Sequence, residues 1–175
     1  MLSYIVVSLL GPDRPGIVFE VSRLADDCGC QIQDSRMAVL AGEFAAQMLV
    51  CGKWSAIAKL ESSLPRTSAE LGLELTIHRT EPRTDTDRLI PYSVEVLSLT
   101  RPGVVRDVAE FFSRRDINVE DLFTSCYAAA HTQAPMYSLH MTVGVPADLA
   151  IATLRNEFLE LCDELNLDAV MTAFK

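Results

Sequence analysis

The segment Asp13-Arg14-Pro15-Gly16 is the clearest group of residues in this sequence whose types and spacing could do chemistry. It follows an apolar run and precedes an amphipathic one, so it joins a predicted strand to a predicted helix. Pro15 suits the first helical position, and Gly16 lets the backbone approach a ligand closely. The first turn of a helix offers unpaired N–H groups and a partial positive charge, which favour a carboxylate. Asp13 could hold an ammonium group, so the turn suits a small amino acid. The same residues also suit a purely structural turn, with Asp13 as a local cap.

The same turn occurs again half a chain length later. Arg14-Pro15-Gly16 reappears as Arg101-Pro102-Gly103, 87 residues further on (101 − 14). The same spacing relates five more pairs of positions: Ile17 and Val104, Val21 and Val108, Leu24 and Phe111, Ile32 and Val119, and Asp34 and Asp121. Because the spacing is half of the 175 residues, it indicates a duplicated domain rather than an array of short repeats.

Each copy contains the same order of predicted elements. Apolar, β-rich runs predict strands, and apolar residues at helical spacing predict helices. The predicted strands cover residues 4–10, 31–40, 44–51 and 73–77, then 92–99, 119–127, 137–145 and 167–174. The predicted helices cover residues 17–28, 54–64, 104–112 and 151–165, and Trp54 is expected to anchor helix packing. The order β-α-β-β-α-β predicts the α+β ferredoxin-like fold, an antiparallel four-stranded sheet with two helices on one face.

We therefore expect two tandem domains, residues 1–80 and 92–175, joined by a linker at 81–91. The segment around the linker is polar and contains two prolines, as linkers often do. The second copy has a longer hairpin connection than the first, Ala128–Met136 in place of the tight turn Ala41–Glu43. The helix-free face of each sheet needs a cover, which the sister domain or a second subunit could provide. We expect the protein to form a homo-oligomer through its sheets.

The charge and hydropathy of the chain exclude several classes of protein. The net charge is −9, which disfavours binding to nucleic acid phosphates and to anionic membrane surfaces. No stretch approaches the ~20 apolar residues that span a bilayer. The N-terminal run lacks the basic start and the cleavage site of a signal peptide, which predicts a cytoplasmic protein.

The cysteines and histidines do not form a recognisable catalytic or metal motif. The five cysteines are Cys28, Cys30, Cys51, Cys126 and Cys162, and the three histidines are His78, His131 and His140. Cys28 and Cys30 form C-x-C, which differs from the C-x-x-C of redox and zinc pairs. We expect free thiols that pack as small apolar side chains, no catalytic residues, no metal and no cofactor. A thiol enzyme or redox sensor at Cys28 and Cys30 is the alternative.

Longer strings in the sequence carry a family resemblance. The βαββαβ unit with DRPGIV after its first strand resembles the ACT domain, a small amino-acid-sensing module, and the resemblance covers both copies. CGCQIQDSRMAVLAGEF (28–44), GKWSAIAKLESSLP (52–65) and ELN (164–166) are similar to the glycine cleavage system transcriptional repressor family of Gram-negative bacteria. The resemblance implies a non-enzymatic regulator that responds to glycine. It also implies that the regulator contacts a LysR-type activator of the glycine cleavage genes rather than DNA.

The resemblance also implies a set of ligand-binding residues. ACT ligands usually lie between the strand-to-helix turn of one domain and the start of the second strand of a neighbour. The matching residues are Asp13, Arg14, Gly16, Ile17 and Gln31 in the first copy and Thr100, Arg101, Gly103, Val104 and Asn118 in the second. Neither copy holds the full set, because Gln31 replaces the usual asparagine and Thr100 replaces Asp13.

Four alternatives follow from this uneven set of residues. The two copies could share one site, or one copy could bind and the other be silent. The protein could instead be an interaction module that binds no ligand, or it could regulate another amino-acid pathway. Repression of genes by direct binding to DNA is a further hypothesis, which the net charge of −9 disfavours.

Overall fold

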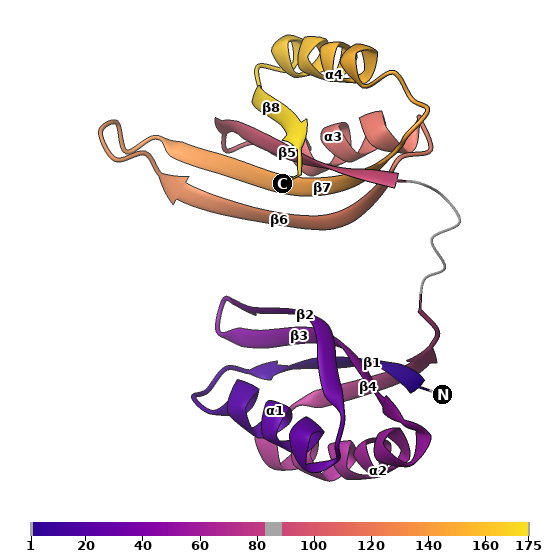
Figure 1. Cartoon of the computed structure of the whole chain (residues 1–175). Coiled ribbons are helices and arrows are strands. Elements are labelled where there is room, and N and C mark those ends of the chain that lie inside the picture. The colour runs from indigo at the N-terminus through magenta and orange to yellow at the C-terminus, as the bar shows by residue number, and fades with distance from the viewer. Residues whose placement is uncertain (1, 83–88, 175) are drawn as a thin grey trace. The chain divides into compact units, whose positions relative to one another are not determined.

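The computed structural model describes residues 2–82 and 89–174 (Figure 1). By its contacts the chain divides into two compact units, residues 1–84 and 85–175, and each is described by itself. Residues 83–88 of the predicted linker, 81–91, lie outside the described residues. The last three residues of that range already belong to a strand, which begins at Leu89.

The first unit has the predicted βαββαβ order. Its elements are β1 (Leu2–Pro12), α1 (Ile17–Asp27), β2 (Gln31–Leu40), β3 (Glu43–Lys53), α2 (Trp54–Leu71) and β4 (Glu74–Thr80). The strands form one antiparallel sheet in the order β2-β3-β1-β4, and both helices cover the same face of it (Figure 1).

The second unit repeats this arrangement. Its elements are β5 (Leu89–Leu99), α3 (Val104–Ser113), β6 (Asn118–Ala128), β7 (Pro135–Pro146), α4 (Ile151–Glu164) and β8 (Asp168–Ala173). The sheet order is β6-β7-β5-β8, again antiparallel, with α3 and α4 on one face (Figure 1). The prediction of an α+β protein with two ferredoxin-like folds is confirmed.

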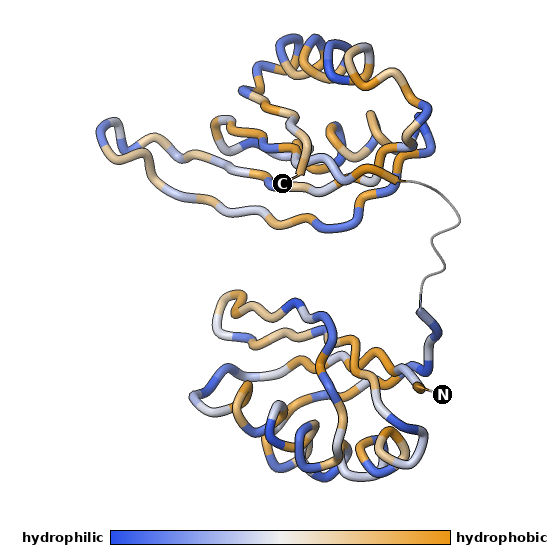
Figure 2. Tube along the Cα trace, viewed as in Figure 1, coloured by the Kyte–Doolittle hydropathy of each residue, from blue (hydrophilic) through white to orange (hydrophobic). Residues whose placement is uncertain are grey.

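Alternation along the strands and helical spacing along the helices build a separate core in each unit. On β1, Ile5, Val7 and Leu9 are buried, while the residues between them are more exposed. Apolar residues recur along each helix (Figure 2). The buried ones pack against the buried residues of the strands and form one core cluster in each unit. Each strand-to-helix turn is therefore held between a buried strand and a buried helix.

The duplication extends to irregular details of the backbone. The register of β2 on β3 shifts between Ile32 and Asp34, and that of β6 on β7 shifts between Val119 and Asp121. An inserted residue in one strand of an antiparallel pair is a β-bulge. The same bulge at matching positions in both units shows that the backbone itself was duplicated, and not only the apolar pattern.

The second helix of the first unit begins at residue 54 as predicted but extends beyond its predicted end. The helix runs on to Leu71, past Pro65, because Leu60, Leu64 and Ser68 continue one buried stripe that outweighs the hydrogen bond that a proline removes. Trp54 is 64% exposed, so the expectation that it anchors helix packing is wrong. Because α2 begins at Trp54 directly after β3, the helix reaches the core only from Ile57 onward.

Candidate functional site

The first strand-to-helix turn is built on Gly16. Gly16 has φ 96° and ψ −11°, which are the angles of the third residue of a type II turn, and proline favours the second position. Gly16 is the N-cap of α1, so Pro15 lies one residue before the cap, and its expected place at the first helical position is wrong. Ile17, the first helical residue, is buried and fixes the turn to the core.

The start of α1 keeps its capacity to bind an anion. The Glu20 N–H donates to the Gly16 carbonyl oxygen at 2.9 Å, which makes the first helical hydrogen bond. Among the described residues, no side chain caps this helix through a hydrogen bond. The N–H groups of the first turn therefore have neither a helical partner nor a side-chain cap.

Asp13 and Arg14, the two polar residues of the first turn, make different contacts. The Asp13 backbone N–H donates to the Gly42 carbonyl at 2.9 Å, so the end of β1 is tied to the β2–β3 hairpin while the Asp13 side chain is exposed. The Arg14 guanidinium donates from Nη2 to the Glu70 carbonyl at 3.0 Å. Arg14 is thus directed to the last turn of α2, where carbonyl groups carry partial negative charge.

The second turn has the same backbone but a different side-chain environment. Gly103 has φ 93°, Val104 is buried, and the Thr100 N–H donates to the Pro135 carbonyl at 2.8 Å, as Asp13 does to Gly42. Arg101, however, donates from Nη1 to the Pro102 carbonyl and to Asp107 Oδ2, both at 3.3 Å.

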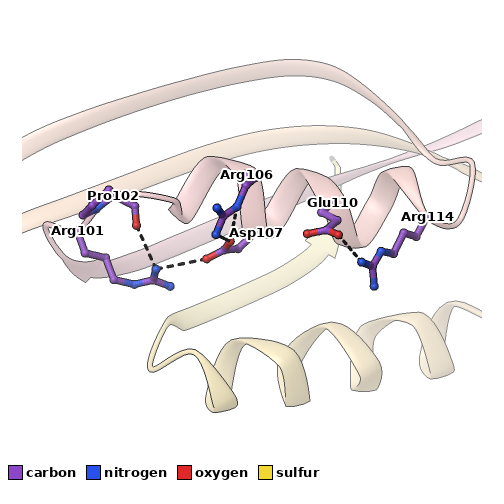
Figure 3. A network of polar contacts seen from close by, with 6 residues as sticks. All are labelled: Arg101, Pro102, Arg106, Asp107, Glu110 and Arg114. Carbon is purple, nitrogen blue, oxygen red and sulfur yellow. Dashed lines mark hydrogen bonds and ion pairs between the residues drawn. The ribbon is translucent and has the colours of Figure 1, made fainter.

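A second arginine completes a polar network beside this turn (Figure 3). Arg106 donates to Asp107 Oδ1 from Nη2 at 2.7 Å and from Nε at 3.0 Å. The Asp107 side chain is only 14% exposed. Hydrogen bonds from Arg106 and then from Arg101 hold the pKa of the Asp107 carboxyl below its usual value, against the effect of burial. Asp107 is therefore an ionised carboxylate between two guanidinium groups.

The two strand-start residues of the predicted site lie away from the turn of their own unit. Gln31 opens β2 and pairs with Cys51, which also faces Tyr4 near the beginning of β1. The Gly16 turn follows the other end of β1, roughly 27 Å away along the strand at ~3.4 Å per residue. Asn118 opens β6 in the same way and pairs with Gly144. Within one unit, the structure brings together the turn residues but not Gln31 or Asn118.

Comparisons with known proteins fit this geometry. A family model described as an ACT domain matches residues 3–78, the first of the two units. The glycine cleavage system transcriptional repressor of Escherichia coli (strain K12) is 35% identical over 163 residues, which are 93% of this chain and 86% of that protein. This chain belongs to the glycine cleavage system transcriptional repressor family.

Solved structures extend the family likeness to the whole fold. A crystal structure with a provisional assignment to this repressor family has a TM-score of 0.71 at 28% identity and covers 100% of this chain and 99% of its own. A protein of unknown function from Galdieria sulphuraria has a TM-score of 0.78 at 23% identity over the full length of both chains, which shows the shared fold. Membership of the repressor family confirms the expectation of a non-enzymatic regulator.

The thiols of this family member are mostly buried. Cys28, Cys30, Cys51 and Cys162 are buried, and Cys126 is exposed. Burial raises the pKa of the Cys30 thiol, and it raises the pKa of Cys162 to about 11. A raised pKa disfavours the thiolate, which is the reactive form. This agrees with thiols that pack as small apolar groups and gives no support to a redox role for Cys28 and Cys30.

Two absences among the described residues bear on the remaining chemistry. Within residues 2–82 and 89–174, no three His, Cys, Asp or Glu side chains are grouped so that they could hold a metal ion. No helix in the same ranges is long and apolar enough to cross a membrane.

Sequence reasoning missed Arg106 and Asp107, although a signal for them was present. Asp107 lies four residues after Gly103, so it belongs to the first helical turn above the glycine. The matching positions of the first copy hold Phe19 and Glu20. Comparing the copies beyond the Pro-Gly pair would have shown that only the second has an arginine beside the first-turn carboxylate.

Proposed function

We propose that this protein controls glycine cleavage genes in response to glycine or a similar small amino acid, acting through contact with a LysR-type activator. The observation that carries the proposal is its 35% identity, over 93% of the chain, to the Escherichia coli repressor. Such an activator works on the bacterial chromosome, so the proposed place of action is the cytoplasm.

The open turn at Gly16 supports an amino acid as the effector. A helix start without a side-chain cap suits the carboxylate of the ligand, and the exposed Asp13 carboxylate suits its ammonium group. Arg14, Gly16 and Ile17 shape the turn. Because Gln31 and Asn118 lie far from the turn of their own unit, they would act on the turn of a neighbouring ACT domain.

The charge of the chain supports action through a protein rather than through DNA. At a net charge of −9, the chain has no excess of Lys and Arg to neutralise phosphates, which supply most non-specific DNA affinity. The proposed partner, which binds DNA itself, would supply the DNA contacts.

The helix-free face of the second sheet supports homo-oligomer formation. On this face, Phe123, His140, Glu95 and Val170 lie in one row across the four strands, and the Phe123 ring stacks on His140 at 4.7 Å. Six large apolar side chains of this face are exposed: Leu97, Leu99, Phe123, Tyr127, Val170 and Phe174. Exposed apolar patches of this kind mark interaction surfaces.

One observation favours a second candidate function for part of the chain. The network around Asp107 already places a carboxylate beside the second turn. An ACT fold whose turn is filled in this way would act as an interaction module that binds no ligand. Titration of the protein with small amino acids distinguishes this interaction module from an amino-acid sensor.

Isothermal titration of the purified chain with glycine, alanine and serine tests the effector. We expect a saturable heat with at least one of them, in the micromolar to low millimolar range that is typical of weak small-ligand binding. Absence of heat with all three at millimolar concentration would contradict amino-acid sensing and favour the interaction module.

Affinity purification from the native bacterium, followed by mass spectrometry, tests the partner. We expect a LysR-type activator to be retained, and glycine to change the amount retained. A gel-shift assay with the glycine cleavage promoter should show no complex with this protein alone. A shift in the absence of the activator would contradict action through protein contact.

A further inference from the structure

The two helices of the second unit border a groove. Its volume is about 430 Å³, and residues of both α3 and α4 line it. Glu110 and Arg114 lie on the side of α3 that faces α4 (Figure 3). The apolar side chains of Phe111, Leu161 and Leu165 form part of the lining, and five carboxylate-bearing residues outnumber two arginines around them. The groove is therefore both acidic and partly apolar.

Packing and one charged hydrogen bond fix the shape of this groove. The Arg115 guanidinium donates from Nη2 to Glu157 Oε2 at 2.7 Å, which ties the end of α3 to α4. The same guanidinium lies over the Phe111 ring, 3.8 Å from its centroid. Phe111 in turn packs against Phe158 of the core, with 5.3 Å between the ring centroids. A preformed surface of this kind loses little conformational entropy when a partner binds.

Two carboxylates of the groove are not neutralised within the unit. Three others have arginine partners: Glu110 with Arg114, Glu157 with Arg115, and Asp107 with Arg106. Among the described residues, no cation pairs with Glu160 or Glu164, and both side chains are exposed. Glu164 is the last residue of α4, where the helix dipole favours a cation, and it lies four residues after Glu160, so the like charges repel. These two residues therefore lower the stability of their own helix.

The first copy has a neutral version of this pair. Counted back from Gly72 and Asn166, the left-handed residues that follow each helix, the two unpaired carboxylates of α4 correspond to Arg66 and Glu70 of α2. In α2, Arg66 donates from Nε to Glu70 Oε1 at 2.8 Å. One copy therefore pairs these positions in a salt bridge, whereas the other leaves two negative charges beside a partly apolar groove.

The negative charge of the chain is concentrated in the unit that holds this groove. Residues 85–175 contain 14 Asp and Glu against 7 Lys and Arg, whereas residues 1–84 contain 10 against 8. An acidic surface disfavours anionic partners and complements cationic ones, and a groove with apolar lining suits the apolar side of an amphipathic helix. Lysines or arginines four residues apart on such a helix, about 6 Å from each other, match the spacing of Glu160 and Glu164.

We propose that the α3–α4 groove is the docking site for a basic amphipathic helix of the protein partner. Glu160 and Glu164 pair with its lysines or arginines, and Phe111, Leu161 and Leu165 contact its apolar side chains. This inference rests on the proposed function, in which the protein acts by contact with an activator, and it assigns that contact to the second unit.

Binding of the purified LysR-type activator to charge variants of the full chain tests this surface. Glu160→Arg gives α4 the arginine–glutamate pair of the first copy, so it should weaken binding about tenfold or more without lowering the Tm. Asp148→Arg changes the net charge equally in the exposed turn before α4, and Arg66→Glu makes the reverse change in α2. Both controls should leave the affinity within about twofold. Equal weakening by Asp148→Arg and Glu160→Arg would reduce the effect to overall charge and overturn the inference.

A synthetic peptide of leucine and lysine tests the groove without the activator. The probe is a helical peptide with a leucine stripe bordered by lysines four residues apart, and the control peptide has serine in place of leucine. In NMR titration of the full chain, the leucine peptide should shift the amide signals of Phe111, Leu161 and Glu164, and this effect should be lost in Glu160→Arg. Absence of shifts, shifts confined to other surfaces, or equal shifts with the serine peptide would overturn the inference.

The two experiments separate this inference from the function on which it rests. Activator binding that is equal in the wild type and in Glu160→Arg would overturn the inference and leave the proposed function intact. Absence of activator binding by the wild type, with the leucine peptide still bound in the groove, would overturn the proposed partner and leave the groove as a docking site for a basic helix. Absence of both would overturn both.

Discussion

The two copies of the fold keep the same backbone where it is most unusual, yet fill it with different residues. Gly29, which follows the end of α1, has φ 75°, and Asp116 has φ 54° at the matching position after α3. Gly72 follows α2 with φ 71°, and Asn166 has φ 54° after α4. Asp and Asn are the side-chain-bearing residues that visit this left-handed region most readily. Backbone conformation therefore constrains both copies alike, while the side chains have been free to diverge.

The cores have diverged as well. Apart from Phe44, the large buried side chains of the first unit are not aromatic, with Ile5, Ile17 and Met48 among them. The second unit is built around Phe111, Phe112 and Phe158, whose ring centroids lie 5.2–5.3 Å apart. Since each core is closed within its own unit, the stability of the two units should be separable.

Substitution of one core residue in each unit tests this separation. Phe158→Ala should cost the second unit about 3–5 kcal/mol, because it leaves a cavity among three rings, and Leu64→Ala should cost the first about 2–5 kcal/mol. Urea unfolding followed by NMR should show that each change shifts only the signals of its own unit. A single transition that moves equally in both variants would show that the units unfold together.

A smaller difference concerns the end of the first strand, where Gly11 matches Ser98. A Cβ on Gly11 would lie 2.7 Å from the Gly72 carbonyl oxygen, so backbone must move to accept it. Ser98 is buried and its hydroxyl donates to the Leu99 carbonyl at 3.0 Å. One copy therefore excludes a side chain where the other uses one.

Placing each of these residues at the other position should change the stability of the two units unequally. Gly11→Ser should destabilise the first unit by about 1–3 kcal/mol through overpacking, and Ser98→Gly should cost the second about 1 kcal/mol through the lost hydrogen bond. Thermal unfolding measures both. Equal and negligible effects would mean that α2 can move away from Gly11 without loss.

Asp116, which has left-handed backbone angles after α3, is a position where a substitution should increase stability. Asp116→Gly should stabilise the second unit by up to about 1 kcal/mol, because glycine adopts positive φ without a steric penalty. Gly29→Asp is the matched change in the first unit and should destabilise it by a similar amount. A loss of stability in Asp116→Gly would indicate that the Asp116 side chain makes a contact worth more than the backbone strain.

The fold was predictable from the sequence because the repeat and the apolar spacing support each other. The strands and helices of both copies are confirmed, and so are the tight Ala41–Glu43 turn and the longer Ala128–Met136 connection. Besides the place of Pro15 before the N-cap, two details of α2 were not predicted correctly. The helix extends beyond the predicted range 54–64 to Leu71, and Trp54 is exposed, because the position of a helix over a core decides which residues are buried.

The candidate site was predictable in its backbone but not in its side chains. Arg14 and Arg101 both precede a Pro-Gly pair, yet one donates to the Glu70 carbonyl and the other to Asp107. A turn motif fixes φ and ψ, whereas the direction of a long arginine depends on groups from other elements. The sequence could show which residues differ beside the two turns, but only the structure shows which groups the two arginines contact.

The smallest predicted effect is on the titration of Asp107, and it probes the difference between the turns directly. Its pKa is held below the usual value, mainly by Arg106 and then by Arg101. The ionised network thus contributes stability above the pKa of the unfolded chain, ~3.9, and this contribution is lost as the pH falls through the lowered pKa of the folded state. NMR titration should give a lower value for Asp107 in the wild type than in Arg106→Ala, which removes two of its donors. Asp107→Asn should reduce the acid sensitivity of the second unit and leave that of the first unchanged. An Asp107 pKa that does not move in Arg106→Ala would mean that Arg106 does not hold the Asp107 carboxylate in solution, and the side chains beside the two turns would then differ less than their hydrogen bonds indicate.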